Sequence, residues 1–384
     1  MKKIKVMTVF GTRPEAIKMA PLAIELEKNP NIESIVCVTA QHRQMLDQVL
    51  EIFNIKPDYD LDIMKERQTL VEITARVLEG LDKVLKEAKP DIVLVHGDTS
   101  TSFVGALAAF YNQIKVGHVE AGLRTYDIYS PFPEEMNRCL TGRIAEMNFS
   151  PTINNKNNLL KENVKEDTIF ITGNTVIDAM KTTVKDNFVF KTEELNKIDY
   201  KAKRVITMTA HRRENLGKPL ENICNAVKRL VKKYDDIEVV YPVHLNPAVR
   251  ETVNGILGGM DRVHLIEPVN VDELHNLMAR SYLVMTDSGG IQEEAPYLAK
   301  PVLVMRKETE RPEAVDAGTV KIAGVDEEVI FNLACDLIDN KDSYDKMAKA
   351  INPYGDGNAS ERIVDAILYE FGIKNERPAD YVTK

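Results

Sequence analysis

The sequence predicts an α/β protein made of two Rossmann-like, doubly wound domains that face a central cleft. Strand-like apolar segments alternate with amphipathic helical segments along nearly the whole chain, which is typical of parallel sheets covered by helices on both faces. The pattern starts again after a polar stretch around residues 185–203, and the second half then echoes the first. One large domain whose charged loops only cap helices is the alternative interpretation.

Two pairs of matching segments carry the repetition. KVMTVFGTRPE, from Lys5, matches RVITMTAHRRE, from Arg204, and each is a strand followed by a polar turn that ends in Arg and Glu. DIVLVHGDTSTS, from Asp91, matches YLVMTDSGGIQEE, from Tyr282, and each is a strand followed by an Asp and small residues. Ligands of doubly wound sheets bind beyond the carboxyl ends of the strands. The charged motifs of this chain cluster at those ends, so we expect the ligand there.

The expected elements follow from apolar runs bounded by turn residues. We expect helices at Leu70–Glu87 and Ser360–Leu368. We expect strands at Lys5–Phe10, Ser34–Thr39, Ile92–His96, Val116–Val119, Met147–Ser150 and within 169–174, and at Arg204–Thr209, Ile237–Pro242, Val263–Ile266, Tyr282–Thr286 and Pro301–Met305. The predicted domains are residues 1–172 and 173–365, with a C-terminal helix in 366–384 that packs back on the first domain.

The composition excludes several classes of protein. The 384 residues suffice for two domains, and a net charge of −9 argues against nonspecific nucleic-acid binding. No apolar run approaches the ~20 residues of a membrane helix, and charges return too early in the chain for a secretory signal. The four cysteines lie far apart and form no C-x-x-C pair. We therefore expect a cytoplasmic protein with reduced thiols and no membrane segment.

The turn after the first strand, GTRPEAIK, has the outline of an anion site. A strand, a turn at Gly11 and a helix start place backbone N–H groups and the helix dipole toward a ligand. The segment differs from the G-x-G-x-x-G and P-loop motifs because it has one glycine and three charged side chains, Arg13, Glu15 and Lys18. Charged side chains in this turn indicate a ligand that is reached by side chains rather than by backbone.

The strongest signal for a phosphate group is TDSGGIQEEAP. Ser288, Gly289 and Gly290 allow close backbone approach, and their N–H groups open a helix that can cradle a diphosphate. Glu294 follows a little under two helical turns after Ser288, where its carboxylate could accept hydrogen bonds from ribose hydroxyls. A plain helix start with a surface glutamate is the alternative.

Cations from separate loops add to this signal. TERPEAV supplies Arg311, and HRREN supplies His211, Arg212 and Arg213. Arginine suits a planar two-point grip on phosphate, whereas lysine supplies a point charge. Surface salt bridges are the alternative, but each of these cations follows the end of a predicted strand.

The candidate acids come from the first half of the chain. Asp98, Glu120 and Glu134 lie in three separate loops, the first two directly after predicted strands, and together they could serve as acid–base groups. Each alone is more typical of a helix cap or a salt-bridge partner. His96 and His118 lie next to Asp98 and Glu120 and could support them. No tight metal-ligand spacing occurs among the seven histidines, so we expect neither a catalytic metal nor a cofactor.

Ten motifs in order give the chain a specific resemblance. They span residues 11–357 and are GTRPEAIKMAP, VHGDT, VEAGLR, SPFPEEMNR, TGNTVID, TAHRREN, PVHLNP, TDSGGIQEEAP, TERPEAV and NPYGDG. The chain closely resembles the non-hydrolysing UDP-N-acetylglucosamine 2-epimerases. The resemblance implies a glycosyltransferase-B-like fold, a homodimer, and a second domain that binds UDP. It also implies interconversion of UDP-N-acetylglucosamine and UDP-N-acetylmannosamine, which supplies N-acetylmannosamine units for cell-surface polysaccharide.

The implied reaction explains why acids and cations are both needed. The C2 proton is not next to a carbonyl, so the family eliminates UDP to leave 2-acetamidoglucal and then adds UDP back. Prearranged cations stabilise the leaving diphosphate, one group removes the C2 proton, and another returns a proton to the opposite face. By motif, the catalytic residues are Lys18, Asp98, Glu120, Glu134 and His211, and the substrate-binding residues are Arg13, Ser288, Gly289, Gly290, Glu294 and Arg311. The resemblance leaves open which acid handles which proton.

Bacterial members of the family also carry a regulatory UDP-N-acetylglucosamine beside the active site. The matching residues here are Gln41, Gln44, Arg67, Gln68, Glu135, Arg212 and His244. One position departs from the family pattern, because Leu274 stands where relatives often have an aromatic residue. We therefore expect stacking on the uracil to be weaker or to come from elsewhere.

Three alternative functions remain open. A UDP-sugar glycosyltransferase of the same fold would share the SGG segment and Glu294 but would need an acceptor. A hydrolysing 2-epimerase would release UDP and free N-acetylmannosamine. A sensor of nucleotide sugars would bind without chemistry, although three acids near a dianionic diphosphate would bring it no benefit.

Overall fold

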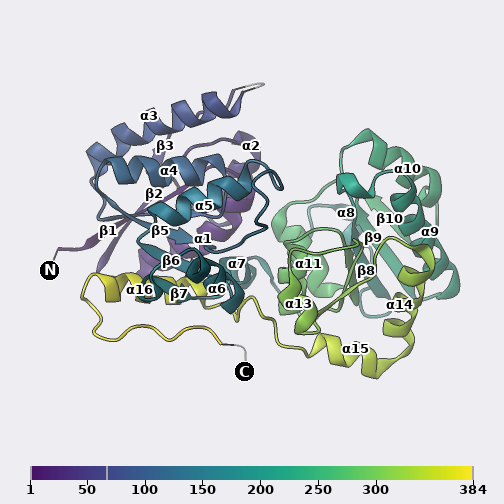
Figure 1. Cartoon of the computed structure of the whole chain (residues 1–384). Coiled ribbons are helices and arrows are strands. Elements are labelled where there is room, and N and C mark those ends of the chain that lie inside the picture. The colour runs from purple at the N-terminus through teal and green to yellow at the C-terminus, as the bar shows by residue number, and fades with distance from the viewer. Residues whose placement is uncertain (1, 66–67, 383–384) are drawn as a thin grey trace. The chain divides into compact units, whose positions relative to one another are not determined.

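The computed structural model describes residues 2–65 and 68–382 and divides them into two compact units. Unit 1 contains the residues up to Thr182 together with Tyr354–Val382, and unit 2 is Thr183–Pro353. The yellow C-terminal segment therefore returns to the unit formed by the purple N-terminal segment (Figure 1). Within the described residues, no helix is both long enough and apolar enough to cross a membrane.

Unit 1 is built on a seven-stranded sheet in the order β3-β2-β1-β4-β5-β6-β7, and every neighbouring pair is parallel. Its strands are β1 (Ile4–Phe10), β2 (Ile32–Val38), β3 (Tyr59–Asp60), β4 (Ile92–His96), β5 (Lys115–Val119), β6 (Met147–Ser150) and β7 (Ile169–Ile171). Its helices are α1 (Arg13–Lys28), α2 (Arg43–Ile52), α3 (Leu70–Ala88), α4 (Ser100–Tyr111), α5 (Glu134–Ile144), α6 (Ile153–Lys161), the 3₁₀ turn η1 (Glu166–Thr168), α7 (Thr175–Thr183) and α16 (Ala359–Glu370).

Unit 2 is built on a six-stranded parallel sheet in the order β10-β9-β8-β11-β12-β13. Its strands are β8 (Arg204–Thr209), β9 (Ile237–Pro242), β10 (Val263–Ile266), β11 (Leu283–Thr286), β12 (Val302–Val304) and β13 (Val320–Ile322). Its helices are α8 (Glu193–Asn196), the 3₁₀ turn η2 (Arg213–Asn215), α9 (Lys218–Lys233), α10 (Pro247–Leu257), α11 (Val271–Arg280), α12 (Ile291–Tyr297), α13 (Pro312–Asp316), α14 (Glu327–Asp339) and α15 (Lys341–Ala348).

The sheets are parallel because both faces of their central strands are apolar. Along β1, the side chains of Ile4, Val6 and Phe10 join one buried cluster, whereas Met7 and Val9 join the cluster on the opposite face. This alternation follows the two-residue period of a strand. The prediction of two doubly wound sheets is confirmed.

Most expected elements are present with small shifts of their ends, and two strands were not expected. β3 reads YD and β13 reads VKI, so neither contains an apolar run, whereas the equally short strands β7 and β12 read IFI and VLV. The first unit also extends to Thr182, beyond the expected boundary at residue 172. The cause is Asp178 on α7, whose carboxylate accepts hydrogen bonds from the backbone N–H groups of Ala359 and Ser360 and so ties α7 to α16.

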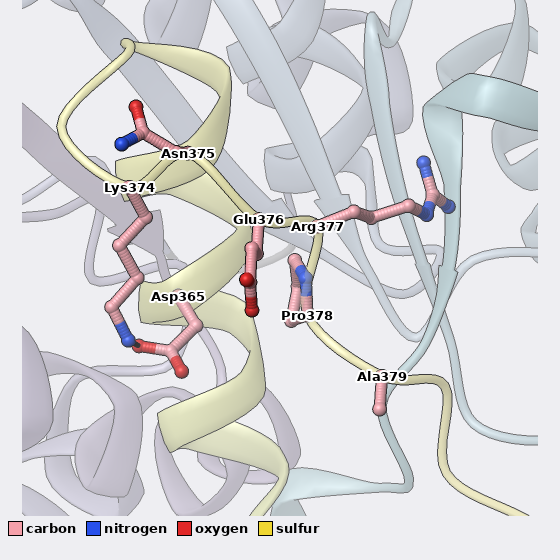
Figure 2. Close-up of a pocket in the computed structure, with 7 residues that line it drawn as sticks. All are labelled: Asp365, Lys374, Asn375, Glu376, Arg377, Pro378 and Ala379. Carbon is pink, nitrogen blue, oxygen red and sulfur yellow. Dashed lines mark hydrogen bonds and ion pairs between the residues drawn. The ribbon is translucent and has the colours of Figure 1, made fainter.

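The C-terminal segment after α16 covers the edge strand β7. The N–H of Tyr381 donates to the carbonyl of Ile171 (2.7 Å), and the N–H of Ile171 donates to Asp380 (2.9 Å). Edge strands left open invite pairing with other chains, so this cover protects the sheet. The segment also borders a hollow of about 590 Å³, where Lys374 pairs with Asp365 at 2.6 Å (Figure 2).

Each sheet has one topological switch point, between β1 and β4 in unit 1 and between β8 and β11 in unit 2. These four strands are the ones whose sequences echo each other. At a switch point the loops after the two central strands diverge and leave a crevice at the carboxyl ends of the strands. The loops that follow β1, β4, β8 and β11 therefore position the candidate site.

Candidate active site

A buried carboxylate joins the two loops at the switch point of unit 1. Glu15, in the first turn of α1, is 1% exposed and accepts hydrogen bonds from the backbone N–H groups of Gly11 (3.0 Å) and Thr12 (2.8 Å). Its other oxygen accepts from the hydroxyls of Thr99 (2.6 Å) and Ser102 (2.8 Å), which follow β4. Burial raises the pKa of Glu15, although these hydrogen bonds oppose the shift. Glu15 thus fixes the GTRPE turn, a role that the sequence alone did not show.

Asp98 lies at the same edge and is held by an arginine. Arg138 on α5 donates to one oxygen of Asp98 from Nε (2.9 Å) and from a terminal nitrogen (2.6 Å). The amide of Asn137 donates to the backbone carbonyl of Asp98 (2.9 Å). The Asp98 side chain is 26% exposed, so its carboxylate is oriented by Arg138 and is still reachable from solvent.

Glu120, directly after β5, is the centre of a second polar cluster. Its carboxylate forms an ion pair with Lys18 of α1, accepts a hydrogen bond from the Asn174 amide (2.8 Å), and lies 3.5 Å from Nε2 of His96. The Glu120 side chain is 10% exposed. Its φ of +62° is a left-handed conformation that non-glycine residues rarely adopt and that often marks functional sites. The structure therefore joins the predicted residues Lys18 and Glu120.

Two buried histidines lie beneath these acids. Burial lowers the pKa of His96 to about 4, while Glu120 opposes the shift and Lys18 adds to it. Burial also lowers the pKa of His118 to about 4, against the effect of its hydrogen bond from Nε2 to the carbonyl of Gly97 (2.7 Å). Both rings are therefore neutral at neutral pH.

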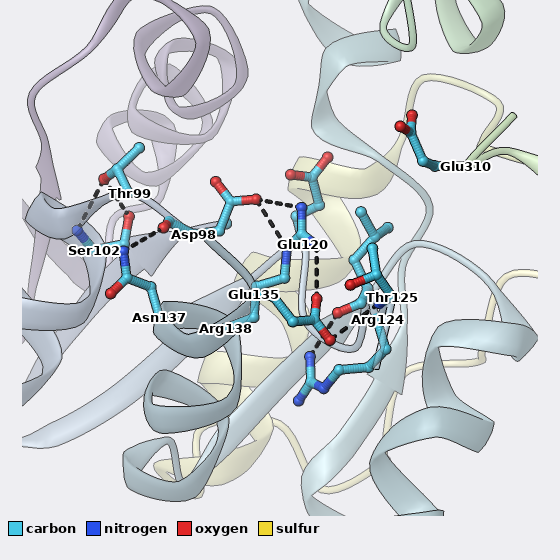
Figure 3. A network of polar contacts seen from close by, with 12 residues as sticks. Asp98, Thr99, Ser102, Glu120, Arg124, Thr125, Glu135, Asn137, Arg138 and Glu310 are labelled. Carbon is cyan, nitrogen blue, oxygen red and sulfur yellow. Dashed lines mark hydrogen bonds and ion pairs between the residues drawn. The ribbon is translucent and has the colours of Figure 1, made fainter. Parts of the chain in front are cut away.

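The segment between β5 and α5 contains Glu134 and Glu135, which have different surroundings. Glu135 is 1% exposed, accepts hydrogen bonds from the backbone N–H groups of Thr125 and Tyr126, and pairs with Arg138 at 3.0 Å. Figure 3 shows Glu135 and Arg138 beside Asp98. Glu134 is the first residue of α5 and is half-buried. Arg138 thus connects Asp98 to Glu135, which makes it a site residue that the sequence analysis did not select.

Of the N-terminal residues predicted for a regulatory site, Gln41 lies in the loop after β2, and Gln68 lies in the segment before α3. The side-chain oxygen of Gln41 accepts a hydrogen bond from Thr101 (3.0 Å), and the Gln68 amide donates to the Gln41 carbonyl (3.4 Å). Gln44 is exposed on α2, and Arg67 lies outside the described residues. A Cβ placed on Gly11 would lie 1.9 Å from Thr39 of the β2 loop, so only glycine fits there.

Unit 2 has its own buried carboxylate at its switch point. Asp287, after β11, is fully buried and accepts hydrogen bonds from the backbone N–H groups of His211 and Arg212 (2.7 Å each). The Asn215 amide donates to the same oxygen (3.1 Å). Asp287 therefore fixes the HRREN loop after β8, and this role too was missed.

The SGG segment lies next to arginines of unit 2. A Cβ placed on Gly289 would lie 4.0 Å from a terminal nitrogen of Arg212, 4.0 Å from one of Arg311 and 3.7 Å from a carboxylate oxygen of Glu310. Gly289 thus leaves open the space that these three side chains face. The helix that follows, α12, has only seven residues, so the guanidinium groups supply most of the positive charge.

Further charged side chains support this cluster. Arg311 forms an ion pair with Glu293, which is 1% exposed. Arg306, only 13% exposed, pairs with Glu214 (2.9 Å) and Glu310 (3.1 Å). The sequence analysis did not select Arg306, because it lies outside the recognised motifs, although it directly follows the expected strand Pro301–Met305.

Glu294 and His211 face different partners. Glu294 lies 3.5 Å from Nε2 of the fully buried His275 on α11, and the preceding residue of that helix, Leu274, is half-buried. His211 stacks on His244, with ring centroids 5.2 Å apart and an interplanar angle of 8°. Burial lowers the pKa of His211, against the field of Asp287 at 3.4 Å.

The site residues thus form two groups, one in each unit. Unit 1 holds Lys18, Asp98 and Glu120 with neutral histidines, and unit 2 holds the SGG segment, two arginines, His211 and Glu294. Among the described residues, no group of three or more His, Cys, Asp or Glu side chains is arranged to hold a metal ion. Arg13, the first residue of α1, is half-buried in unit 1.

Two doubly wound parallel sheets with sites at their switch points define the class of glycosyltransferase-B-like proteins. The sequence model of UDP-N-acetylglucosamine 2-epimerase matches residues 24–368. A Bacillus subtilis protein named UDP-N-acetylglucosamine 2-epimerase is 61% identical over 384 residues, which are all of both chains. The chain therefore belongs to the UDP-N-acetylglucosamine 2-epimerase family.

Solved structures agree with this assignment. A crystal structure of a UDP-N-acetylglucosamine 2-epimerase is 59% identical, superposes with a TM-score of 0.93 and covers all of both chains. The enzyme from Neisseria meningitidis, whose structure has UDP-N-acetylglucosamine bound, is 52% identical with a TM-score of 0.85 and covers 95% of this chain and 100% of its own.

Proposed function

We propose that this protein interconverts UDP-N-acetylglucosamine and UDP-N-acetylmannosamine without hydrolysing them. The observation that carries the proposal is the pairing of Lys18 with Glu120 beside the oriented Asp98, in a chain of this family. A base takes the C2 proton while the C1–O bond breaks, and UDP leaves with the bonding electrons. UDP then adds back to C1 of 2-acetamidoglucal, and an acid returns a proton to the opposite face of C2.

The acids of unit 1 have surroundings that suit proton transfer. Arg138 orients Asp98, and Lys18 with Asn174 orients Glu120, so each carboxylate has a fixed direction before substrate binds. Burial keeps His96, 3.5 Å from Glu120, in its neutral form, so the ring adds no positive charge beside this carboxylate. Glu134 is the third candidate acid. The assignment of each acid to the removal or return of the proton stays open.

The cations of unit 2 suit the UDP portion of the substrate. Arg212 and Arg311 face the space that Gly289 leaves open, where a diphosphate can approach the backbone closely. These charges stabilise the leaving UDP as the C1–O bond breaks. Ser288 and Gly290 complete the segment, Glu294 accepts from the ribose hydroxyls, and His211 lies at the same edge of the sheet. Arg13 contributes a further nucleotide contact.

We propose that the protein acts as a homodimer. Six large apolar side chains on α4, α5 and the loop before α5 are exposed, and the two helices pack against each other. They are Phe110, Tyr111, Tyr129, Phe132, Met136 and Leu140. Exposed apolar surface of this kind marks a protein contact. Sedimentation analysis of wild type and of Phe110→Glu tests this, and a monomeric wild type contradicts it.

A regulatory UDP-N-acetylglucosamine is the second part of this proposal. Gln41 and Gln68 share one loop region of unit 1, and Arg212 and His244 lie in unit 2 beside Gly289 and His211. Glu135 would act by holding its loop, because its oxygens are taken by Thr125, Tyr126 and Arg138. Sigmoidal dependence of the rate on substrate, lost in Gln41→Ala, supports this regulatory site, whereas hyperbolic kinetics of the wild type contradict it. The product is proposed to serve cell-surface polysaccharide synthesis.

Proton NMR in deuterated water tests the reaction. We expect UDP-N-acetylmannosamine with deuterium at C2 when the purified protein meets UDP-N-acetylglucosamine. Release of free N-acetylmannosamine would instead indicate a hydrolysing epimerase. Consumption of the nucleotide sugar only with an added acceptor would indicate a glycosyltransferase. If the substrate stays unchanged although a separate experiment shows that it binds, a sensor of nucleotide sugars is the remaining interpretation.

A further inference from the structure

An acidic side chain lies inside the arginine cluster of unit 2. Glu310, in the loop after β12, pairs with two nitrogens of Arg306, at 3.1 Å and 3.2 Å. One of its carboxylate oxygens is also the atom nearest to the position of a Cβ on Gly289, at 3.7 Å, with Arg212 and Arg311 each at 4.0 Å from that position. The carboxylate of Glu310 therefore lies in the space proposed for the diphosphate.

The charges around Glu310 explain its position. Three guanidinium groups on two loops repel one another unless an anion lies among them. Burial raises the pKa of the Glu310 carboxyl, but Arg306, Arg212 and Arg311 together lower it below its usual value, so the group is ionised. The side chains of Arg306 and Glu310 are 13% and 43% exposed. The arginine is thus fixed, whereas the glutamate has room to turn toward solvent.

We propose that Glu310 is an internal anion that the ligand's diphosphate must displace from the arginines. This inference rests on the proposed function, because it takes the SGG segment as the diphosphate site. In the free protein, Glu310 keeps the arginines in place and repels small anions. On binding, the two phosphates replace one carboxylate and make more charge-assisted hydrogen bonds with the same guanidinium groups.

The displacement makes the site selective for anions that gain enough contacts. A single inorganic phosphate must overcome repulsion by Glu310 and offers few contacts in return. UDP makes contacts through both its diphosphate and its nucleoside, so its larger binding energy overcomes the same repulsion. Glu310 therefore lowers the affinity of the site for every anion, so that only a ligand that makes enough further contacts occupies it at low concentration.

The test is to compare wild type with Glu310→Gln by calorimetric titration, with UDP and with inorganic diphosphate as probes. Glutamine keeps the length and a hydrogen-bond acceptor for Arg306 but removes the charge. We expect both probes to bind ~3–10-fold more tightly to the variant, in line with the modest strength of partly exposed ion pairs. Glu308→Gln, at an exposed position two residues away, is the matched control and should bind both probes as wild type does.

The sign of the change separates this proposal from a purely structural role. If Glu310 only orients the arginines, Glu310→Gln binds UDP more weakly, and the proposal is overturned. Unchanged affinities, or no inorganic diphosphate binding by either protein, also overturn it. The NMR assay of epimerisation is run on both proteins. A wild type without turnover then reports on the proposed function, independently of what Glu310 does to the binding of the two probes.

Discussion

At each of the two switch points, a buried carboxylate holds two diverging loops together, and the carboxylate comes from opposite loops in the two units. In unit 1, Glu15 reaches from the loop after β1 to hydroxyls of the loop after β4. In unit 2, Asp287 reaches from the loop after β11 to backbone N–H groups of the loop after β8. Each carboxylate is almost fully buried and joins the two loops that diverge at its switch point.

The two switch points hold side chains of opposite charge. Unit 1 presents Asp98 and Glu120 as oriented acids, whereas unit 2 presents Arg212 and Arg311 around an open glycine. The difference teaches that the buried carboxylates set the geometry of the loops, while the charged side chains beside them set the function. Mutations of the two groups should therefore give different kinds of defect.

The largest expected effect is on turnover in unit 1. Asp98→Asn should lower kcat by ~10²–10⁴-fold, because the amide cannot exchange a proton as a carboxylate does. UDP affinity, measured by titration, should stay within about twofold of wild type, since the cations of unit 2 are unchanged. Asp365→Asn, on the surface of α16, is the control. Full activity of Asp98→Asn would remove Asp98 from the catalytic acids.

The matching change in unit 2 should affect binding first. Arg311→Ala should weaken UDP binding by ~10–100-fold, because it removes a charged partner of the phosphates and the ion pair with the buried Glu293. Arg213→Ala changes an exposed arginine of the HRREN loop and should bind UDP normally. Equal losses in the two variants would show that only the general charge of unit 2 attracts the ligand.

The two buried carboxylates should differ in their effect on stability. Asp287→Ala removes the acceptor of two backbone N–H groups and one of the two acceptors of the Asn215 amide, and should cost about 3–5 kcal/mol in unfolding free energy. Glu15→Ala should cost less, about 2–4 kcal/mol, because Thr99 and Ser102 can still bond to each other at 3.0 Å. Urea unfolding measures both, and a larger loss for Glu15→Ala would contradict this ranking.

The smallest expected effect is a pH dependence of stability that comes from a buried histidine of unit 1. Burial lowers the pKa of His118 to about 4, below about 6.5 in the unfolded chain, so the unfolded state binds the proton first as pH falls. Its contribution is present above pH 6.5 and is lost between about pH 6.5 and 4. Wild type should therefore lose about 1–3 kcal/mol more than His118→Asn over that interval. Urea unfolding at several pH values measures the free energy of unfolding of both proteins. The same dependence on pH in wild type and His118→Asn would contradict this prediction.

Much of the fold could be predicted because parallel sheets leave clear traces in a sequence. Buried strands read as apolar runs, and the repeated pairs beginning at Lys5 and Asp91, and at Arg204 and Tyr282, became the central strands of the two sheets. β3 and β13 could not be predicted, since YD and VKI contain no apolar run and form strands only because a neighbouring strand offers hydrogen bonds. The reach of α7 into unit 1 likewise depends on Asp178 meeting the start of α16.

The sequence by itself determined the two-domain α/β architecture, the family and the residue types of the site, because these lie in local patterns and ordered motifs. Only the tertiary structure decided which side chains meet. In the folded chain, Arg138 donates a hydrogen bond to Asp98, Lys18 pairs with Glu120, and Glu310 lies among the arginines. These contacts join residues of different loops, and a charged residue in a loop reads the same in a sequence whether it anchors the backbone or faces a ligand.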